Sequence, residues 1–355
     1  GKQTDRDQGE RAKADRAGEM GPGKMGPDTS ARGPGGEMPR DGAPDVGTEL
    51  KGRGIMNRKG IQVVAVVLAA LLCLPGGASA REFLGYGRQV SNDFLGDGKD
   101  RWHTGSASAS RIWGDPWLGR LPQEFGNILE LRIAGEIMAP AKLRRPEPGD
   151  RPYATMLSFG LHSHFDWQGL ETSLGSDLVL TGPMTGLPWL QETVHDWLSI
   201  SSASARVRAA EVPDGVHPTL AFETGRGYAI GAARLRPFLS GRWGDETLLR
   251  AGADVSFGPV GIAELLVRDR VTGQRYRVVQ DKAPGAALVV GADYAYVHDT
   301  IYMPRPRDTR SRVRAGVHVQ LRRGSGFYGL TWMGPEFEGQ PEGQVVGTAR
   351  LKFEF

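Results

Sequence analysis

Apolar and polar residues alternate over much of the chain after residue 80. Between positions 129 and 137, apolar side chains occupy most odd positions and charged side chains several of the even ones; the apolar set is Leu129, Leu131, Ile133 and Ile137. The same period of two recurs at 249–257 and 313–321. This period is typical of a β-strand with one apolar and one polar face. The pattern therefore predicts an all-β protein.

Twelve segments carry strand patterns of this kind. They lie near residues 84–93, 103–113, 127–138, 152–166, 169–182, 217–226, 233–242, 246–257, 286–298, 312–323, 326–335 and 344–355. Stretches of about ten residues match what a tilted strand needs to cross a bilayer, and single-chain bacterial barrels have an even number of strands. We predict a transmembrane antiparallel β-barrel of about 12 strands over residues 81–355.

Two alternatives stay open at this point. A soluble periplasmic β-sandwich also alternates, because it buries one face of each strand and exposes the other. A non-enzymatic barrel, such as a small pore or a structural protein, would use the charged strand faces to line a wet lumen. The eight tryptophans fall mostly at predicted strand ends or in connections, which fits aromatic girdles at a lipid interface. These features favour a membrane barrel over the sandwich.

The alternation lapses between residues 183 and 216, which predicts a loop with a short helix. Long loops often carry functional sites. At the other end of the pattern, the last predicted strand alternates up to Phe355. It resembles the C-terminal strand by which outer-membrane barrels are recognised for assembly, and this resemblance implies the barrel-assembly machinery as a partner.

The most apolar stretch precedes the alternating region. A basic start at 56–59, an apolar run at 61–74 and small residues at 78–80 have the order of a secretory signal. We predict a signal peptide over 56–80, cleaved between Ala80 and Arg81. The run is short for a membrane anchor, which needs roughly 20 apolar residues.

Residues 1–55 are rich in glycine, proline and charged residues and contain almost no large apolar side chains. Such a segment cannot bury enough apolar surface to fold. A long polar tail before an export signal does not fit the way in which the export machinery recognises such a signal. We therefore hypothesise that Met56 is the true start and that 1–55 is a disordered leader encoded upstream of it, which N-terminal sequencing of the native protein would test.

Composition removes several function classes. The only cysteine, Cys73, lies inside the predicted signal, so the mature chain would use neither disulfides nor thiolate chemistry. A lipid anchor on Cys73 is disfavoured because the bulky Leu72 precedes it. A formal charge of +3 is too small to indicate a nucleic-acid partner. The mature region also contains no Gly-rich phosphate loop, zinc-type Cys/His spacing or Gly-x-Ser-x-Gly motif.

Four polar motifs stand out in the mature region. They are Val90-Ser91-Asn92-Asp93, Asp100-Arg101-Trp102-His103-Thr104-Gly105, Asp150-Arg151-Pro152-Tyr153-Ala154, and Gly182-Pro183 followed by Gln191 and His195. In this order they resemble the LpxR family of outer-membrane lipid A 3′-O-deacylases of Gram-negative bacteria, from about residue 84 to Phe355. The resemblance implies a twelve-stranded barrel in the cell outer membrane. It also implies hydrolysis of an acyl ester of lipid A, the anchor of lipopolysaccharide, with calcium as cofactor.

The resemblance carries Asn92, Asp93, Thr104 and His195 onto polar or catalytic positions of the family. A neutral imidazole can accept a proton from water as the water attacks an ester carbonyl, which makes His195 the candidate base. Calcium prefers carboxylate and carbonyl oxygens, so Asp93 and the amide oxygen of Asn92 are the candidate metal ligands. An ion held there would polarise the ester and stabilise the developing oxyanion.

The chain departs from the family at two positions. The family has an acidic residue about six positions beyond its histidine, where this chain has Ser201; Glu192 or Asp196 would be the replacements. The family's lysine has no secure match, and Lys142 is the candidate. These departures leave open an altered acyl position, an altered substrate or an inactive barrel. Because a barrel closes its own sheet edges, we expect a monomer.

Overall fold

The structure is a computed structural model, and it describes residues 81–198 and 202–353. The predicted leader and signal peptide, Ser201 and Phe355 lie outside these residues. Among the described residues, no helix combines the length and apolar character needed to cross a membrane.

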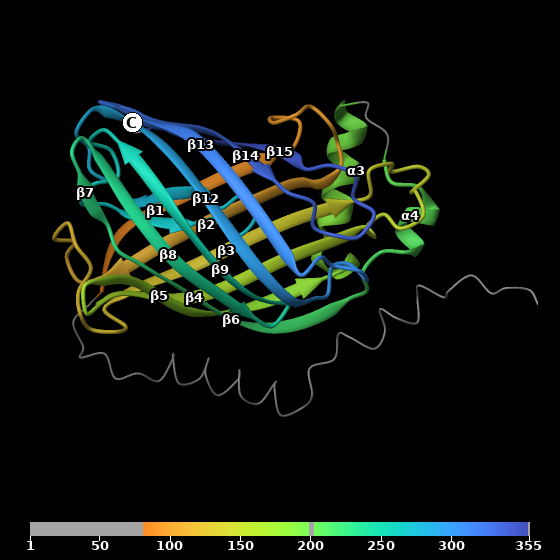
Figure 1. Cartoon of the computed structure of the whole chain (residues 1–355), viewed down its shortest axis with the longest axis horizontal. Helices are drawn as coiled ribbons and strands as arrows, with labels where there is room; N and C mark the ends of the chain where they lie inside the picture. Colours follow the sequence, from red (N-terminus) through yellow and green to blue (C-terminus); the bar gives the residue numbers. More distant parts are fainter. Residues whose placement is uncertain (1–80, 199–201, 354–355) are drawn as a thin grey trace, which may run out of the picture. The chain divides into compact units, whose positions relative to one another are not determined.

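Twelve antiparallel strands form a closed barrel (Figure 1). They are β1 (Glu82–Asn92), β2 (Trp102–Gly114), β3 (Ile128–Ala139), β4 (Ala154–Trp167), β5 (Leu170–Thr181), β6 (Gly215–Gly225), β8 (Ala233–Trp243), β9 (Glu246–Phe257), β12 (Gly285–Thr300), β13 (Thr309–Leu321), β14 (Gly324–Met333) and β15 (Gln344–Phe353). Pairing of β1 with β15 and of β6 with β8 closes the sheet. The predicted fold class and strand number are confirmed.

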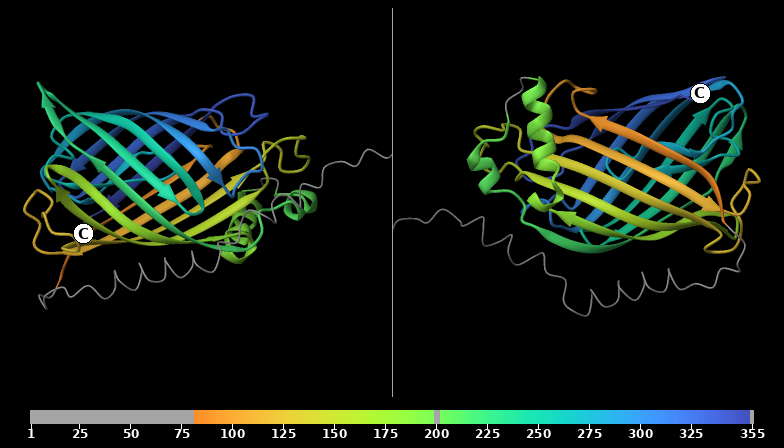
Figure 2. Two further views of the ribbon diagram at one scale, coloured as in Figure 1. Left: turned by 60° about the horizontal axis from the view of Figure 1, so that its bottom comes forward. Right: turned by 180° about the vertical axis from the view of Figure 1, so that it is seen from behind.

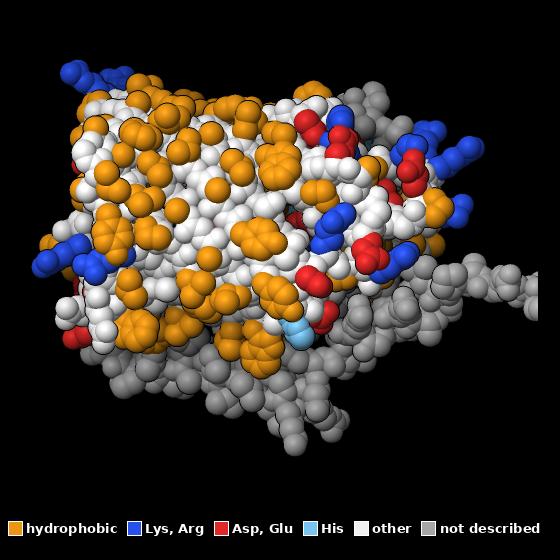
Figure 3. All heavy atoms as spheres, in the orientation of Figure 1, with side chains coloured by type: hydrophobic (Ala, Val, Ile, Leu, Met, Phe, Trp, Pro, Cys, Tyr) orange, Lys and Arg blue, Asp and Glu red, His pale blue; other side chains and the backbone are white. Residues whose placement is uncertain are grey.

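Strand alternation places apolar side chains outside and charged ones inside. In β13, Val313 is 53% exposed on the outer surface, whereas its neighbour Arg312 is only 5% exposed and faces the lumen. Figure 3 shows apolar side chains over the middle of the barrel wall and charged ones towards its two ends. A soluble sandwich would bury the apolar face instead. The sandwich alternative is therefore wrong, and the apolar wall suits lipid.

The two ends of the barrel differ in their connections. One end, which we call the loop rim, carries the connections 93–101, 140–153 and 182–214. The other end, the hairpin rim, has two-residue turns at 168–169 and 322–323, the longer connections 115–127 and 258–284, and the described ends of the chain. Long connections therefore occur at both rims, and the four polar motifs lie at the loop rim.

The connection 182–214 contains more helix than the predicted single short one. It forms η1 (Pro183–Thr185), α3 (Leu187–Leu198) and α4 (Ala205–Ala209). The side chain of Ser204 caps α4 by accepting a hydrogen bond from the Val207 amide. Figure 2 shows α3 outside the barrel, near the loop-rim ends of the first strands.

A hairpin inside the barrel was not predicted. Its strands are β10 (Leu265–Arg268) and β11 (Arg275–Val279), and it enters the lumen from the hairpin rim between β9 and β12. β11 packs on β1, where a Cβ added at Gly87 would lie 2.6 Å from the Arg277 carbonyl oxygen. Gly87 thus permits close approach of the two backbones. The short strand β7 (Tyr228–Ile230), which pairs with β8, was also not predicted.

Two apolar clusters lie at opposite ends of the lumen. The cluster at the loop rim joins strand ends to the connections 301–308 and 334–343 through Tyr302, Met303 and Phe337. The cluster at the hairpin rim joins Tyr276 and Val278 of the hairpin to strands β2 and β3. The charged middle of the lumen lies between them.

The predicted aromatic girdle is only partly a surface feature. Trp167 and Trp243 are exposed at the ends of β4 and β8, as a girdle requires. Trp102, at the start of β2, is instead buried in the apolar cluster at the loop rim. Trp189 and Trp197 are exposed on α3 rather than on strands.

Candidate functional site

The Asn92-Asp93 motif lies where β1 ends at the loop rim. Asn92 Nδ2 donates a hydrogen bond to the Thr104 carbonyl oxygen at 2.6 Å, and Asn92 Oδ1 accepts one from the Phe94 amide at 2.8 Å. The buried Asp93 accepts hydrogen bonds from the amides of Phe94 and Arg101 at 2.8 and 2.7 Å. Both side chains thereby fix the loop that joins β1 to β2, as Asn and Asp often do in turns.

The same loop concentrates negative charge. Burial raises the pKa of Asp93 to about 8. The nearby carboxylates of Asp100 and Asp97 contribute to this rise in pKa, whereas the hydrogen bonds from the Arg101 and Phe94 amides oppose it. Asp97 is paired with Arg101 at 2.8 Å, so Asp93 and Asp100 are the oxygen donors of this loop that could face a cation.

Thr104 lies in a β-bulge at the start of β2. The register between β2 and β3 shifts between His103 and Gly105, so Thr104 has no partner on β3. Bulges of this kind redirect a side chain and occur next to active sites. The Thr104 hydroxyl is buried and has no hydrogen-bond partner in the described part of the chain. Burying a hydroxyl without a hydrogen-bond partner costs free energy. The Thr104 hydroxyl is therefore a candidate to hydrogen-bond a polar group of a ligand.

The residues before the bulge are held under backbone strain. Trp102 has a positive φ of 53°, which L side chains rarely adopt. The Gln344 side chain holds both flanks: its Oε1 accepts from the His103 amide at 3.1 Å, and its Nε2 donates to the Arg101 carbonyl at 2.5 Å. Inside the lumen, the His103 ring contacts Glu136 at 2.5 Å and Glu336 at 2.7 Å. Strain supported in this way is typical of functional sites.

His195 projects from α3 towards this loop. His195 is only 6% exposed, and its Nε2 lies 3.7 Å from Asp100 Oδ2. One helical turn earlier, the buried Gln191 accepts a hydrogen bond from the Tyr153 hydroxyl at 2.5 Å. Gln191 Nε2 has no partner among the described residues. Gln191 and His195 therefore present a spare donor and an imidazole on one face of the helix.

Packing on the outer wall holds α3 in place. Gly135 of β3 is outward-facing, and a Cβ added to it would lie 3.5 Å from Leu187 at the start of the helix. Arg208 of α4 forms an ion pair with Glu192 at 3.3 Å. The side chain of Asn92 belongs to the outward set of β1, which alternates with the buried Ser91. The candidate site thus lies between α3 and the outside of the barrel, at the loop rim.

The predicted site residues separate into two groups. Asn92, Asp93 and Thr104 meet around one loop, and Asp100 of that loop joins them to His195. Lys142 is exposed in the connection 140–153, and its ammonium contacts Glu147 of the same connection. No contact in the described residues links Lys142 to the other four.

Asp100 places a carboxylate beside His195, whereas the sequence predicted Glu192 or Asp196 in that role. Glu192 pairs with Arg208, and Asp196 is exposed on α3. Asp100 belongs to the second of the four motifs but was not assigned a role. Its position before a strand that starts beside Asn92 is the signal that could have identified it.

The donor set suits calcium in its chemistry. Asn92, Asp93 and Asp100 supply amide and carboxylate oxygens, the ligands that calcium prefers. The described residues contain no group of three or more His, Cys, Asp or Glu side chains arranged around a metal position. Calcium takes six to eight oxygen ligands. Water or substrate oxygens would therefore have to complete its coordination.

Comparisons with known proteins give a family match and a solved barrel of similar fold. The model of the family "Outer membrane protein LpxR" matches residues 64–204, which include all four motifs and end just beyond α3. The solved structure of LpxR from Salmonella typhimurium is similar with a TM-score of 0.62 at 17% identity, over 76% of this chain and 100% of that chain. No curated protein matches the chain by sequence.

Two other solved barrels are less similar. The β domain of the Bordetella autotransporter BrkA has a TM-score of 0.36 at 10% identity, over 77% of this chain and 99% of that one. The CymD monoaromatic hydrocarbon channel has a TM-score of 0.33 at 11% identity, over 81% of this chain and 92% of that one. These scores are too low to support an argument. The chain is therefore similar to the LpxR family over residues 64–204, and it shares the fold of a twelve-stranded outer-membrane barrel with the solved LpxR structure.

Proposed function

We propose that the chain is an outer-membrane esterase that hydrolyses a 3′-O-linked acyl or acyloxyacyl ester of lipid A. The observation that carries the proposal is the approach of His195 Nε2 to Asp100 Oδ2, 3.7 Å apart, in the loop that leads to the bulged Thr104. These groups lie outside the barrel at one rim, where an ester of a membrane lipid is within reach. A lumen site would be closed to such a substrate by the barrel wall.

The reaction needs a base that accepts a proton from water. Neutral His195 takes that proton as the water oxygen attacks the ester carbonyl carbon. When the tetrahedral intermediate collapses, the bond between the carbonyl carbon and the sugar oxygen breaks. The imidazolium returns its proton to that sugar oxygen, which leaves a sugar hydroxyl and a free fatty acid. The carboxylate of Asp100 favours the imidazolium that forms during the reaction.

Two further groups have free hydrogen-bonding capacity for the substrate. The Thr104 hydroxyl and Gln191 Nε2 are buried donors without partners in the described chain. A donor aimed at a developing oxyanion is worth about 10²–10³-fold in rate. We assign these two groups to the ester carbonyl and the oxygens around it. Calcium, when bound by Asn92, Asp93 and Asp100, would polarise the same carbonyl as a Lewis acid.

The non-enzymatic alternative has less support. The hairpin β10–β11 and two apolar clusters occupy the lumen, so no observation favours a conducting pore. A monomeric state and recognition of the final strand by the barrel-assembly machinery remain predictions of the sequence.

The purified barrel tests the proposal directly. Folded protein in detergent is incubated with lipid A, with calcium or with a chelator, and the released fatty acid is measured by mass spectrometry. We expect release with calcium and at least tenfold less with the chelator. Release that is unaffected by chelation would remove calcium from the proposal, and no release from folded protein would remove the esterase.

A further inference from the structure

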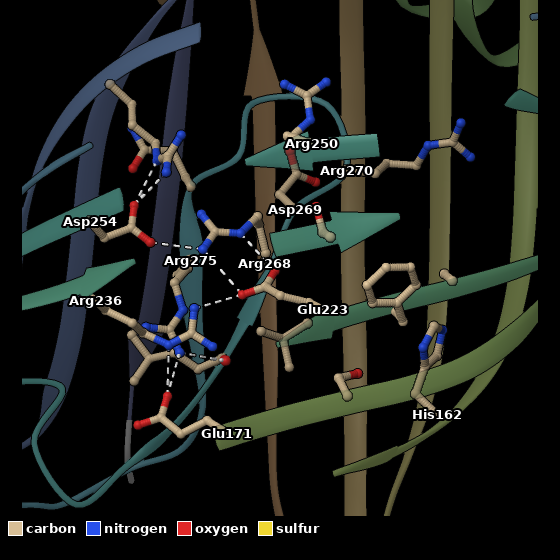
Figure 4. Close-up of a pocket in the computed structure, with 18 of the residues that line it drawn as sticks. His162, Glu171, Glu223, Arg236, Arg250, Asp254, Arg268, Asp269, Arg270 and Arg275 are labelled. Carbon is tan, nitrogen blue, oxygen red and sulfur yellow. Dashed lines mark hydrogen bonds and ion pairs between the residues drawn. The ribbon is translucent and has the colours of Figure 1, made fainter. Parts of the chain in front are cut away.

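A continuous network of arginines and carboxylates lines the lumen, away from the candidate esterase site (Figure 4). At its hairpin-rim end, Glu171 contacts Arg234 at 3.0 Å, Arg236 at 2.7 Å and Arg275 at 3.9 Å. Arg236 also reaches Glu223 at 2.7 Å. Three guanidinium groups therefore share the single carboxylate of Glu171.

Arg268 of the hairpin continues the network. It contacts Glu223 at 2.7 Å and Asp254 at 2.8 Å, and it donates to the Gly273 carbonyl at 2.9 Å. Arg268 thereby joins the barrel wall to the hairpin.

A second shared carboxylate lies further into the barrel. Arg314 contacts both Asp254 and Asp293. Asp293 also accepts bonds from Arg250 and from Arg312, the latter at 3.0 Å. Three guanidinium groups again share one carboxylate.

The network carries more positive than negative charge. Seven arginines contact four carboxylates, which leaves an excess of three positive charges in these contacts. Of the neighbouring carboxylates, Glu264 pairs with Arg277, whereas Asp269 accepts hydrogen bonds from the uncharged Ser108 and Thr272 and so offsets part of this excess. Uncompensated buried charge is costly. The excess indicates that an anion belongs here.

Within this network, Arg275 and Arg250 are the arginines held most weakly by carboxylates. The closest carboxylate to Arg275 is 3.9 Å away, and Arg275 Nε is buried with no partner in the described chain. Arg250 bonds to Asp293 through Nη1, but Arg312 and Arg314 already occupy that carboxylate. Guanidinium groups with spare donors match the oxygens of phosphate.

The network surrounds a cavity of about 430 Å³ between the hairpin and the wall strands β2 to β13. Both Arg250 and Arg275 line it. Its lining extends to Gly169 and Arg226 towards the hairpin rim and to His103 towards the loop rim. The barrel wall separates this cavity from the bilayer, so a soluble anion can enter where a membrane lipid cannot.

We propose that the lumen cavity binds a soluble polyvalent oxyanion of the phosphate class, held by Arg250 and Arg275. The anion neutralises the excess charge and ties the hairpin, through Arg275, to the wall, through Arg250. This site is separate from the esterase site and does not depend on the proposed esterase function.

Isothermal titration calorimetry of the folded full-length barrel in detergent tests the site. Inorganic phosphate and pyrophosphate are titrated at a constant ionic strength of about 0.15 M, set with chloride, so that general screening is the same throughout. We expect saturable binding with one anion per barrel. Pyrophosphate should bind more tightly than phosphate because it carries more charge.

Matched variants locate the binding. Arg250→Gln and Arg275→Gln should each weaken pyrophosphate binding about tenfold, because each removes a charge-assisted hydrogen bond. Arg322→Gln, in the exposed turn between β13 and β14, is the control and should leave the affinity unchanged. If Arg275→Gln does not fold, Arg275→Lys replaces it. Lysine keeps the charge but lacks the planar guanidinium that can donate two parallel hydrogen bonds, so this variant should still weaken binding. Absence of saturable heat with wild-type protein, or equal weakening by Arg322→Gln, would overturn the proposal.

Discussion

The site on the outer wall and the lumen both bury charged groups, but they hold them differently. In the lumen, carboxylates such as Glu223 are held by two arginine side chains. At the loop rim, Asp93 is held by backbone amides. Guanidinium groups neutralise a carboxylate, whereas amides orient Asp93 without placing an opposite charge beside it, and burial raises its pKa to about 8. The lumen charges therefore hold the hairpin to the wall, whereas Asp93 and Asp100 at the rim have no arginine side-chain partner in the described chain.

The largest effect that we expect concerns the base. His195→Ala should lower fatty acid release about 10³-fold, because general-base catalysis contributes roughly 10²–10⁴-fold. Thr193→Ala on the exposed face of α3 is the matched control and should keep the wild-type rate. Rates are measured with purified, folded barrels. A His195→Ala barrel with the wild-type rate would place the chemistry elsewhere.

Next in size is the loss of a lumen carboxylate. Glu223→Gln should lower the free energy of unfolding by about 3 kcal/mol, because it leaves Arg236 and Arg268 buried with one partner fewer. Glu147→Gln, in an exposed pair with Lys142, should change it by less than about 1 kcal/mol. Urea unfolding of the folded barrels measures both. Equal small effects would mean that the lumen network does not stabilise the barrel.

A smaller effect should follow removal of the carboxylate beside the base. Asp100→Asn should lower fatty acid release about 10- to 100-fold, the range seen when a supporting partner of a functional group is lost. Asp196→Asn, on the exposed side of α3, should have little effect. The opposite ranking would show that the helix, rather than the β1–β2 loop, supplies the supporting carboxylate.

The strand pattern was predictable because lipid and lumen impose opposite polarity on alternate residues. The predicted strand 246–257 coincides with β9, and 84–93 differs from β1 by two residues at the start and one at the end. The hairpin was not predictable in this way. Val267 and Tyr276 are buried, and strands of four and five residues enclosed by lumen give no clear alternation.

The candidate site was predictable as a set of motifs but not as a geometry. Asn92, Asp93 and Thr104 lie near one another in the sequence, so their meeting follows from one loop. The contact between Asp100 and His195 joins residues far apart in the chain and depends on how α3 packs against the barrel. From sequence spacing alone, the supporting carboxylate was expected near Ser201, at Glu192 or Asp196.

The smallest effect should come from Lys142. Because its ammonium contacts Glu147 in an exposed connection, Lys142→Ala should change fatty acid release less than about twofold. The same release measurement with purified barrels tests this. A tenfold loss would show that Lys142 reaches the substrate in the bound state.

The most direct test of the central claim is mass spectrometry of lipid A from a laboratory Gram-negative strain that expresses residues 56–355. We predict that wild-type protein removes the mass of one acyl or acyloxyacyl group, and that His195→Ala protein at the same outer-membrane level does not. Unchanged lipid A in cells that contain folded wild-type barrel would contradict the assignment of a lipid A esterase.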